Sequence, residues 1–340
     1  MYIRFSHSLK ALFSDFFILY AGYFLCKKVP FWSGIFSSSF YSILSPALFC
    51  IALCALSIFL YDLLVLKQNY NSTSFEGLRF AARAMKHLYN GRPMVSDIKE
   101  SYPFFLLLIK LFFVPLMLQF SILNFESLRS SIPQLLQNPH AEKGWIYAFN
   151  HDYYPILLSL CFFIDTIFYL FGYLIYSPIL GNTIRSVETT FLGWASALLC
   201  YPPFFMITQN FLPSRHSDYP FWLNENLTFA LRCSMLLLLI IYTLATINLG
   251  WKCSNLTNRG IVSHGVYSIV RHPAYIAKNL FWWISLIPVV YIFPQSIFFL
   301  LGINLLYLIR ALTEERHLKK DPDYQAYCKK VPYRFIPYVV

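Results

Sequence analysis

The segment at residues 41–66, YSILSPALFCIALCALSIFLYDLLVL, decides the fold class, because Asp62 is its one charged residue. A membrane-crossing helix needs about 20 predominantly apolar residues, and this segment exceeds that length. Hydrophobic residues make up 57% of the 340-residue chain and charged residues 13%, which is the composition of a membrane protein. Seven more apolar segments are candidate spans: 11–26, 102–123, 154–176, 189–207, 228–250, 279–293 and 295–309. We predict an all-α, polytopic integral membrane bundle of about eight transmembrane helices.

The distribution of Lys and Arg predicts the orientation, because cytoplasmic loops are enriched in both. With both termini on the cytoplasmic side, the cytoplasmic segments hold most of the 27 Lys and Arg residues, and the pair Lys27 and Lys28 is the exception. We therefore predict a multi-pass protein with both termini cytoplasmic. The net charge of +11 follows from this orientation and from contact with anionic lipid head groups, so nucleic acid is not a predicted partner.

Two further patterns bear on the class of protein. Residues 75–88, FEGLRFAARAMKHL, have the spacing of a basic amphipathic helix, which lies either on the cytoplasmic membrane surface or on an ordinary solvated loop. The eight cysteines show neither C-x-x-C spacing nor a pattern of His partners. We therefore predict no metal site.

The segment 259–283, RGIVSHGVYSIVRHPAYIAKNLFWW, concentrates polar residues beside an apolar stretch. The residue before a proline is driven away from the α region, so His272 is predicted at a break, with Pro273 in the first turn of the next helix. Free N–H groups at a helix start favour an anionic group.

A second polar cluster lies in 308–337, LIRALTEERHLKKDPDYQAYCKKVPYRFIP, where Arg310, Glu314 and Glu315 are expected just past the last span. The last two candidate spans are short and separated by Pro294, which predicts a C-terminal helical hairpin. Such a hairpin brings both polar clusters to the same membrane face. Taken alone, the second cluster also fits a solvated juxtamembrane helix with ion pairs along its surface.

Together the two clusters resemble the isoprenylcysteine carboxyl methyltransferase family and the wider group of membrane phospholipid methyltransferases, over about residues 251–340. The family's G-V-Y-x-x-x-R-H-P-x-Y-x-G element, its E-E-x-x-L and its Y-x-x-Y with a following V-P all have counterparts. Two positions depart from the family pattern, since Ala277 replaces a glycine and the loop KKDPD replaces a Phe-Gly. The matching residues are Gly265, Val266, Tyr267, Arg271, His272, Pro273, Tyr275, Glu314, Glu315, Leu318, Tyr324, Tyr327, Val331, Pro332 and Pro337.

The resemblance implies an integral membrane methyltransferase that uses S-adenosyl-L-methionine on a lipid-like acceptor, such as an isoprenylcysteine carboxylate or a phospholipid amine. It implies a cytoplasmic cofactor pocket formed by Tyr267, Arg271, His272, Tyr275, Glu314 and Glu315. Arg310 is expected to hold a carboxylate and, with Glu314, to be catalytic. We predict that residues 226–340 form the catalytic region and that residues 1–225 form an N-terminal transmembrane region of unknown role.

Two alternatives come from other classes of protein. A membrane reductase of the sterol or enone type shares the C-terminal helical organisation and uses NADPH, but the adjacent Glu314 and Glu315 after an R-H-P-x-Y element favour the methyltransferase. A transporter or scaffold leaves the polar cluster without a purpose, and the sequence contains no repeated half of the kind that transporters show.

Overall fold

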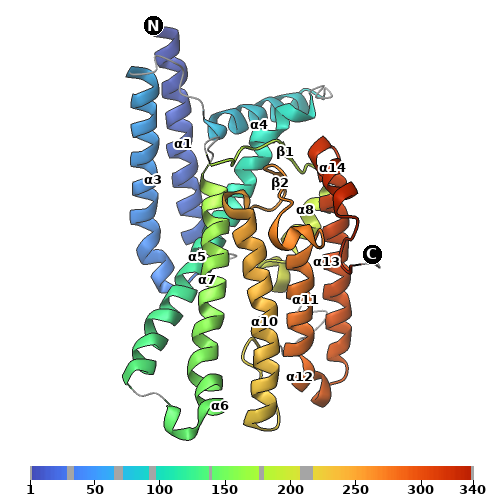
Figure 1. Ribbon diagram of the computed structural model, residues 1–340. Helices are drawn as coiled ribbons and strands as arrows, with labels where there is room; N and C mark the ends of the chain where they lie inside the picture. The colour runs from blue at the N-terminus through green and yellow to red at the C-terminus, as the bar shows by residue number, and fades with distance from the viewer. Residues whose placement is uncertain are drawn as a thin grey trace. The chain divides into compact units, whose positions relative to one another are not determined.

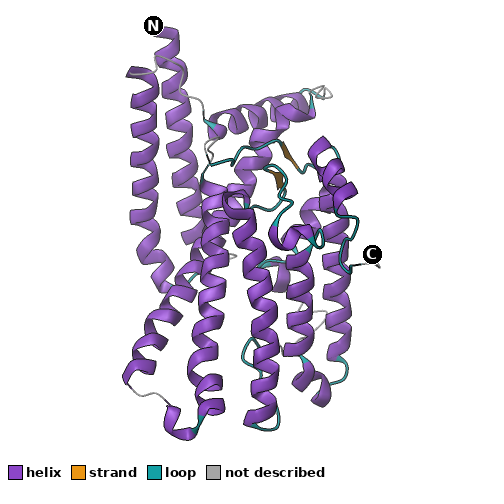
Figure 2. Ribbon diagram, in the orientation of Figure 1, coloured by secondary structure: helices purple, strands orange, loops and turns teal. Residues whose placement is uncertain are grey.

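The computed structural model describes residues 2–28, 34–64, 72–91, 97–137, 140–175, 180–206 and 217–337. The chain divides into two compact units, Met1–Gln119 and Phe120–Val340, which are described separately below. Within the described residues the structure is almost entirely helical, with one short antiparallel strand pair (Figure 2). The predicted fold class, an all-α membrane protein, is therefore confirmed.

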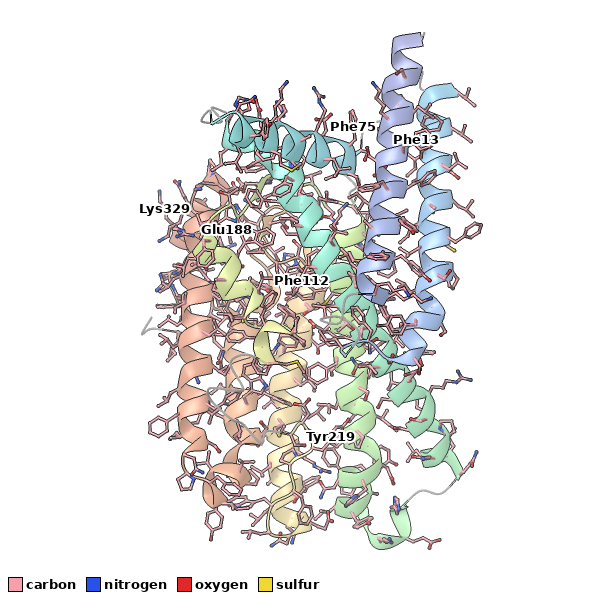
Figure 3. All side chains as sticks on the ribbon, turned by 180° about the vertical axis from the view of Figure 1, so that it is seen from behind. Phe13, Phe75, Phe112, Glu188, Tyr219 and Lys329 are labelled. Atoms are coloured by element: carbon pink, nitrogen blue, oxygen red, sulfur yellow. The ribbon has the colours of Figure 1, made fainter. Side chains whose placement is uncertain are left out.

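The first unit contains two long apolar helices and one amphipathic helix. Its elements are α1 (Tyr2–Lys28), α3 (Ser38–Leu64), α4 (Thr73–Tyr89), the 3-10 helix Ile98–Ser101 and the first half of α5 (Tyr102–Gln137). Both α1 and α3 expose large apolar side chains, as lipid-facing helices do, and α4 lies crosswise to them (Figure 1). Phe75 packs against a cluster of Ala11, Leu12 and Phe59 where α4 reaches α1 (Figure 3). The helix predicted at 75–88 is confirmed, and its crosswise course suits a surface helix.

The second unit is a bundle in which α7, α10, α11 and α13 stand side by side (Figure 1). Side chains of α7, α10 and α11 form the apolar core, which includes Tyr154, Leu158, Met235, Leu239 and Phe281. The elements are the second half of α5, the 3-10 helix His140–Lys143, α6 (Trp145–Ala148), the π-helix Phe149–Tyr153, α7 (Tyr154–Leu174), β1 (Ser186–Val187), α8 (Phe191–Leu198), α10 (Glu225–Leu249), the 3-10 helix Gly250–Lys252, β2 (Thr257–Asn258), the 3-10 helix Gly265–Ser268, α11 (Pro273–Ser285), α12 (Ile287–Ile292), α13 (Ser296–Leu318) and α14 (Pro322–Lys330).

Six helices of the described chain are long and apolar enough to cross a membrane: Ser8–Lys28, Ser38–Tyr61, Ile98–Gln137, Trp145–Leu174, Glu225–Lys252 and Ser296–Leu318. The predicted count of eight is not confirmed. The segment 189–207 contains the eight-residue helix α8 followed by a turn. The segment 279–293 is divided between α11 and α12, because Pro288 at the start of α12 cannot donate a hydrogen bond to the preceding turn.

The last helix extends beyond the predicted span. We expected Arg310, Glu314 and Glu315 just past its end, but α13 continues to Leu318 and carries all three on its final turns. The chain boundary between the two compact units lies after Gln119 and not at 225. Helix α7 is therefore part of the same unit as the predicted catalytic region. The predicted division at residue 225 separates a catalytic region from a region of unknown role, and it stays a prediction.

Close packing of α7 against the loop after α10 requires glycine at position 172. A Cβ atom there would lie 1.9 Å from the carbonyl oxygen of Cys253, so the backbone would have to move. We predict that Gly172→Ala lowers the free energy of unfolding by about 1–3 kcal/mol, as overpacking does. Thermal unfolding in detergent measures this, with Gly34→Ala as control because no atom lies within 4 Å of a Cβ at that position. An unchanged midpoint for Gly172→Ala would contradict the packing described here.

Candidate functional site

A cavity of about 160 Å³ opens where the loops of the second unit meet the ends of its helices. The loop after α10, the start of α11, the end of α13 and α14 form its walls. Six of the seven residues that sequence analysis predicted for the site line this cavity. They are Tyr267, Arg271, His272, Tyr275, Arg310 and Glu314.

The glycine of the G-V-Y element shapes the wall. Gly265 has a φ of +60°, and a Cβ atom there would lie 1.9 Å from Asn248 Oδ1. That oxygen accepts a hydrogen bond from the backbone N–H of Val266 at 3.0 Å, which ties the loop to the end of α10. Only glycine combines this conformation with so close an approach, and the loop in turn places Tyr267 against the cavity.

The break before α11 is confirmed at the predicted residue, since His272 is its N-cap and Pro273 begins the helix. The backbone N–H of Arg271 donates to the Tyr333 carbonyl at 3.0 Å, and that of His272 donates to the Arg334 carbonyl at 3.1 Å. The C-terminal tail is thereby bound to the start of α11. These bonds bring residues together that lie about sixty positions apart in the chain.

Glu315 joins the same segments through its side chain. It is buried, and its carboxylate accepts from Arg271 Nε and Arg334 Nη2, each at 2.9 Å, while His272 Nε2 lies 3.3 Å away. Its side chain does not line the cavity. Glu315 therefore positions the residues around it, whereas the predicted contact with a cofactor stays a prediction.

Glu314, one residue earlier, has the opposite environment. Its side chain is exposed at the cavity and accepts a hydrogen bond from Tyr275 Oη at 2.5 Å. Burial raises the pKa of Tyr275 well above its usual value, with Arg310 opposing and Glu314 reinforcing that shift. The phenol therefore stays protonated at neutral pH and acts as a hydrogen-bond donor. Its ring also stacks on His272, with centroids 5.1 Å apart and an interplanar angle of 6°.

Arg310 lies deeper, on the preceding turn of α13. Its guanidinium is within 6 Å of the ring centres of Tyr201, Tyr275 and Tyr307, and its Nη2 donates to Asn255 Oδ1. Across the described ranges, no carboxylate comes within ion-pair distance of Arg310. A buried cation without a counter-charge is costly, so this guanidinium is suited to an anionic ligand group.

Sequence analysis missed two cations that line the cavity, Lys252 and Arg259. Arg259 donates to Asn182 Oδ1 at 2.6 Å and to Thr257 Oγ1 at 3.1 Å, and burial lowers its pKa to about 10. The pairing of β1 with β2 helps to place Arg259 at the cavity, since Arg259 directly follows β2. The two strands are distant in sequence, so local patterns do not predict this pairing. The sequence drew attention to Arg259 only as the first residue of the quoted segment 259–283, and no role was assigned to it there.

A third missed group is the network at β1. Ser186 Oγ lies 2.8 Å from His317 Nε2, and Glu188 accepts from the backbone N–H of Thr190 at 2.8 Å. Glu188 and His317 both line the cavity, and Glu188 lies near one end of this unit together with Lys329, away from Tyr219 (Figure 3). Burial opposes ionisation of Glu188, but the Thr190 hydrogen bonds and the nearby His317 and Arg316 bring its pKa below the usual value. Glu188 is therefore ionised at neutral pH.

A family model described as a protein of unknown function, DUF1295, matches residues 223–331. That segment is less than half of the chain, and it includes every predicted site residue. The search of curated proteins and the search of solved structures gave no match. The family description names no activity, so it supports neither predicted chemistry over the other.

The contrast between the two adjacent glutamates is testable. We predict that Glu315→Gln lowers the free energy of unfolding by about 3 kcal/mol, because it leaves buried cations without their counter-charge. Glu314→Gln is the matched control and is expected to cost about 1 kcal/mol or less, since it weakens one exposed hydrogen bond. Thermal unfolding of both variants in detergent measures the difference. Equal midpoints would contradict the positioning role of Glu315.

Proposed function

We propose that this protein is an integral membrane methyltransferase that uses S-adenosyl-L-methionine and acts on a lipid-like acceptor. The observation that carries the proposal is the meeting of the R-H-P-x-Y element and Glu314 around one cavity. In this proposal the cavity is the cofactor pocket, it faces the cytoplasm, and both termini lie on that side.

The residues present fit such a cofactor, which carries a sulfonium cation, an amino group, a carboxylate, a ribose and an adenine. Glu314 and the rings of Tyr267 and Tyr275 suit the cationic end, because carboxylates and aromatic faces both attract cations. Tyr324 lines the cavity with a buried hydroxyl that has no hydrogen-bond partner in the described chain, and it suits a polar ligand group.

The roles proposed for the chain's residues follow from their positions. Arg310 holds a carboxylate, because its guanidinium is buried and has no acidic partner among the described residues. Tyr275 and Glu314 form one hydrogen-bonded wall, which fixes the orientation of what they contact. S-adenosyl-L-methionine, when bound, supplies the methyl group. Methyl transfer depends on alignment more than on acid–base catalysis, and the surrounding aromatic rings exclude water from the site.

A lipid-like acceptor is supported by the outer surface of the same helices. Leu280 on α11 and Leu301 and Leu305 on α13 are all exposed, so the bundle that carries the cavity presents apolar side chains outward. Exposed apolar helix faces of this length are lipid-facing in membrane proteins. An acceptor dissolved in the bilayer would therefore approach the site along these helices.

One observation favours a second candidate, a membrane reductase of the sterol or enone type that uses NADPH. The cavity is lined by four strong cations, Lys252, Arg259, Arg271 and Arg310, and by two carboxylates, Glu188 and Glu314. A cationic lining suits the phosphates of a nicotinamide dinucleotide. The Tyr275 phenol would then serve as a hydrogen-bond donor to the substrate that is reduced.

Binding of the two cofactors separates these candidates. We expect purified full-length protein to bind S-adenosyl-L-methionine in calorimetry, and Glu314→Gln to weaken that binding by about tenfold, which corresponds to about 1.4 kcal/mol. Lys329→Gln is the matched control and should leave it unchanged, because Lys329 is exposed and does not line the cavity. Lys252→Gln should also change it little, because in this proposal Arg310 and not Lys252 holds the cofactor's carboxylate. His272→Ala should also lose binding, since His272 stacks on Tyr275.

The opposite result would support the reductase. In that case the folded protein does not bind S-adenosyl-L-methionine, it binds NADPH, and Lys252→Gln removes the NADPH binding. This set of results would overturn the methyltransferase proposal.

A further inference from the structure

Helix α4 of the first unit lies at the level where three apolar helices begin or end (Figure 1). Phe75 packs against Leu12 and Phe59, which lie close to the first residue of the α1 span and to the last residue of the α3 span. A Cβ atom on Gly77 would lie 2.9 Å from the carbonyl oxygen of Pro103, in the first turn of α5. Because each of these helices is long enough to cross the hydrocarbon core, α4 lies at one of its two boundaries.

Polar contacts hold α4 in this position. Ser72 Oγ donates to Asp15 Oδ1 of α1 at 2.6 Å and also accepts a hydrogen bond from the first turn of α4, so the N-cap of the helix attaches it to α1. Arg83 Nη1 lies 3.3 Å from Glu100 Oε2, in the 3-10 helix that precedes α5. Together with the close approach at Gly77, these contacts determine which side of α4 faces the spans.

The second half of α4 carries three large apolar side chains that the described chain leaves uncovered. Met85, Leu88 and Tyr89 are 66%, 82% and 91% exposed, and they form the apolar patch. Leu88 follows Gly77 by about three full turns of helix, so both lie on the side of α4 that faces the spans. An exposed cluster of large apolar side chains marks an interaction site, and at the boundary of a bilayer it enters the acyl region.

The opposite side of α4 is basic. Arg79, Arg83 and Lys86 are exposed and follow one another at spacings of four and three residues, which places them on one face, the basic row. Arg79 pairs with Glu76 at 3.5 Å and Arg83 pairs with Glu100, but ion pairs this exposed are weak. Lys86 has no ion pair among the described residues. Long cationic side chains beside an inserted apolar patch extend to the lipid phosphates.

We propose that α4 binds the surface of an anionic phospholipid bilayer, with the apolar patch among the acyl chains and the basic row at the head groups. The charge of the basic row selects an anionic surface, and the position of α4 brings it to the bilayer that the neighbouring spans cross. The sequence alone allows two interpretations of residues 75–88, and this one explains why three large apolar side chains are uncovered. The inference does not depend on the proposed enzymatic function, because every residue that carries it lies in the first unit.

Methyl NMR of the full-length protein in nanodiscs tests the insertion. The chain has six methionines, so selective labelling of their methyl carbons gives few signals, and Met85→Leu identifies the signal of Met85. We expect a nitroxide on the lipid acyl chain, close to the head group, to broaden this signal, and a gadolinium chelate dissolved in water to leave it sharp. Leu88→Glu should reverse both results, because a carboxylate is excluded from the acyl region, whereas Leu88→Ile should preserve them.

Two spin-labelled lipids in neutral phosphatidylcholine nanodiscs test the charge preference. The labelled phosphatidylglycerol and the labelled phosphatidylcholine carry the nitroxide at the same acyl position and differ in head-group charge. We expect the phosphatidylglycerol to broaden the Met85 signal equally at about fivefold lower concentration, the enrichment that one basic residue near the surface provides. Arg79→Gln combined with Lys86→Gln should remove this difference. Lys143→Gln, which removes an exposed cation of the second unit, should leave it unchanged.

Three results would overturn the inference. Broadening of the Met85 signal by gadolinium and not by the lipid nitroxide would identify α4 as a solvated helix. Protection from both agents would show that protein covers the apolar patch. Equal broadening by the two labelled lipids would show that the basic row does not select anionic head groups. None of these experiments uses a cofactor, so a failure to bind S-adenosyl-L-methionine counts against the proposed function alone.

Discussion

The buried carboxylate of Glu315 is the contact on which the candidate site depends. It accepts hydrogen bonds from Arg271 at the start of α11 and from Arg334 in the tail, with His272 beside it. The backbone bonds between the tail and the start of α11 support the same arrangement, as do the bonds from Arg271 to the carbonyls of Val331 and Pro332 and from Tyr275 to Glu314. An ion cluster of this kind is strongly destabilised when one partner is lost, so α13 fixes both other segments through one side chain. The shape of the cavity therefore depends on a residue that does not line it.

The arrangement of charge around the cavity follows from that fixed frame. Because Glu315 uses its carboxylate on Arg271 and Arg334, the adjacent Glu314 is left as the exposed acid at the cavity, where Tyr275 donates to it. Consecutive residues on a helix point about 100° apart, so one acid faces inward and the other faces the cavity. Arg310 lies more than one turn earlier and faces the aromatic rings instead. One helix thus presents a carboxylate and a guanidinium at different depths.

Much of this could be predicted from the sequence, and the failures have physical causes. The apolar segments predicted the membrane fold, and the proline rule placed His272 at the break before α11. The count of eight spans is not confirmed, because hydropathy alone cannot separate a span from short helices interrupted by turns, as in α11 and α12. Glu315 was assigned to the cofactor pocket from the family resemblance, and the sequence did not indicate that its carboxylate binds Arg271 and Arg334. Lys252 and Arg259 were missed, since tertiary contacts and not local patterns place them at the cavity.

The two cofactor candidates differ most at Lys252. S-adenosyl-L-methionine has one carboxylate, which the methyltransferase proposal assigns to Arg310, so this cofactor offers no second carboxylate to Lys252 or Arg259. Arg259 is accounted for by its hydrogen bonds to Asn182 and Thr257, which hold it as part of the wall. The ammonium of Lys252 has no such bond among the described residues, and it lies 3.3 Å from the position of a Cβ on Gly260. A dinucleotide carries phosphates, which suit an ammonium group, so the choice between the candidates depends on whether Lys252 contacts the ligand or only solvent.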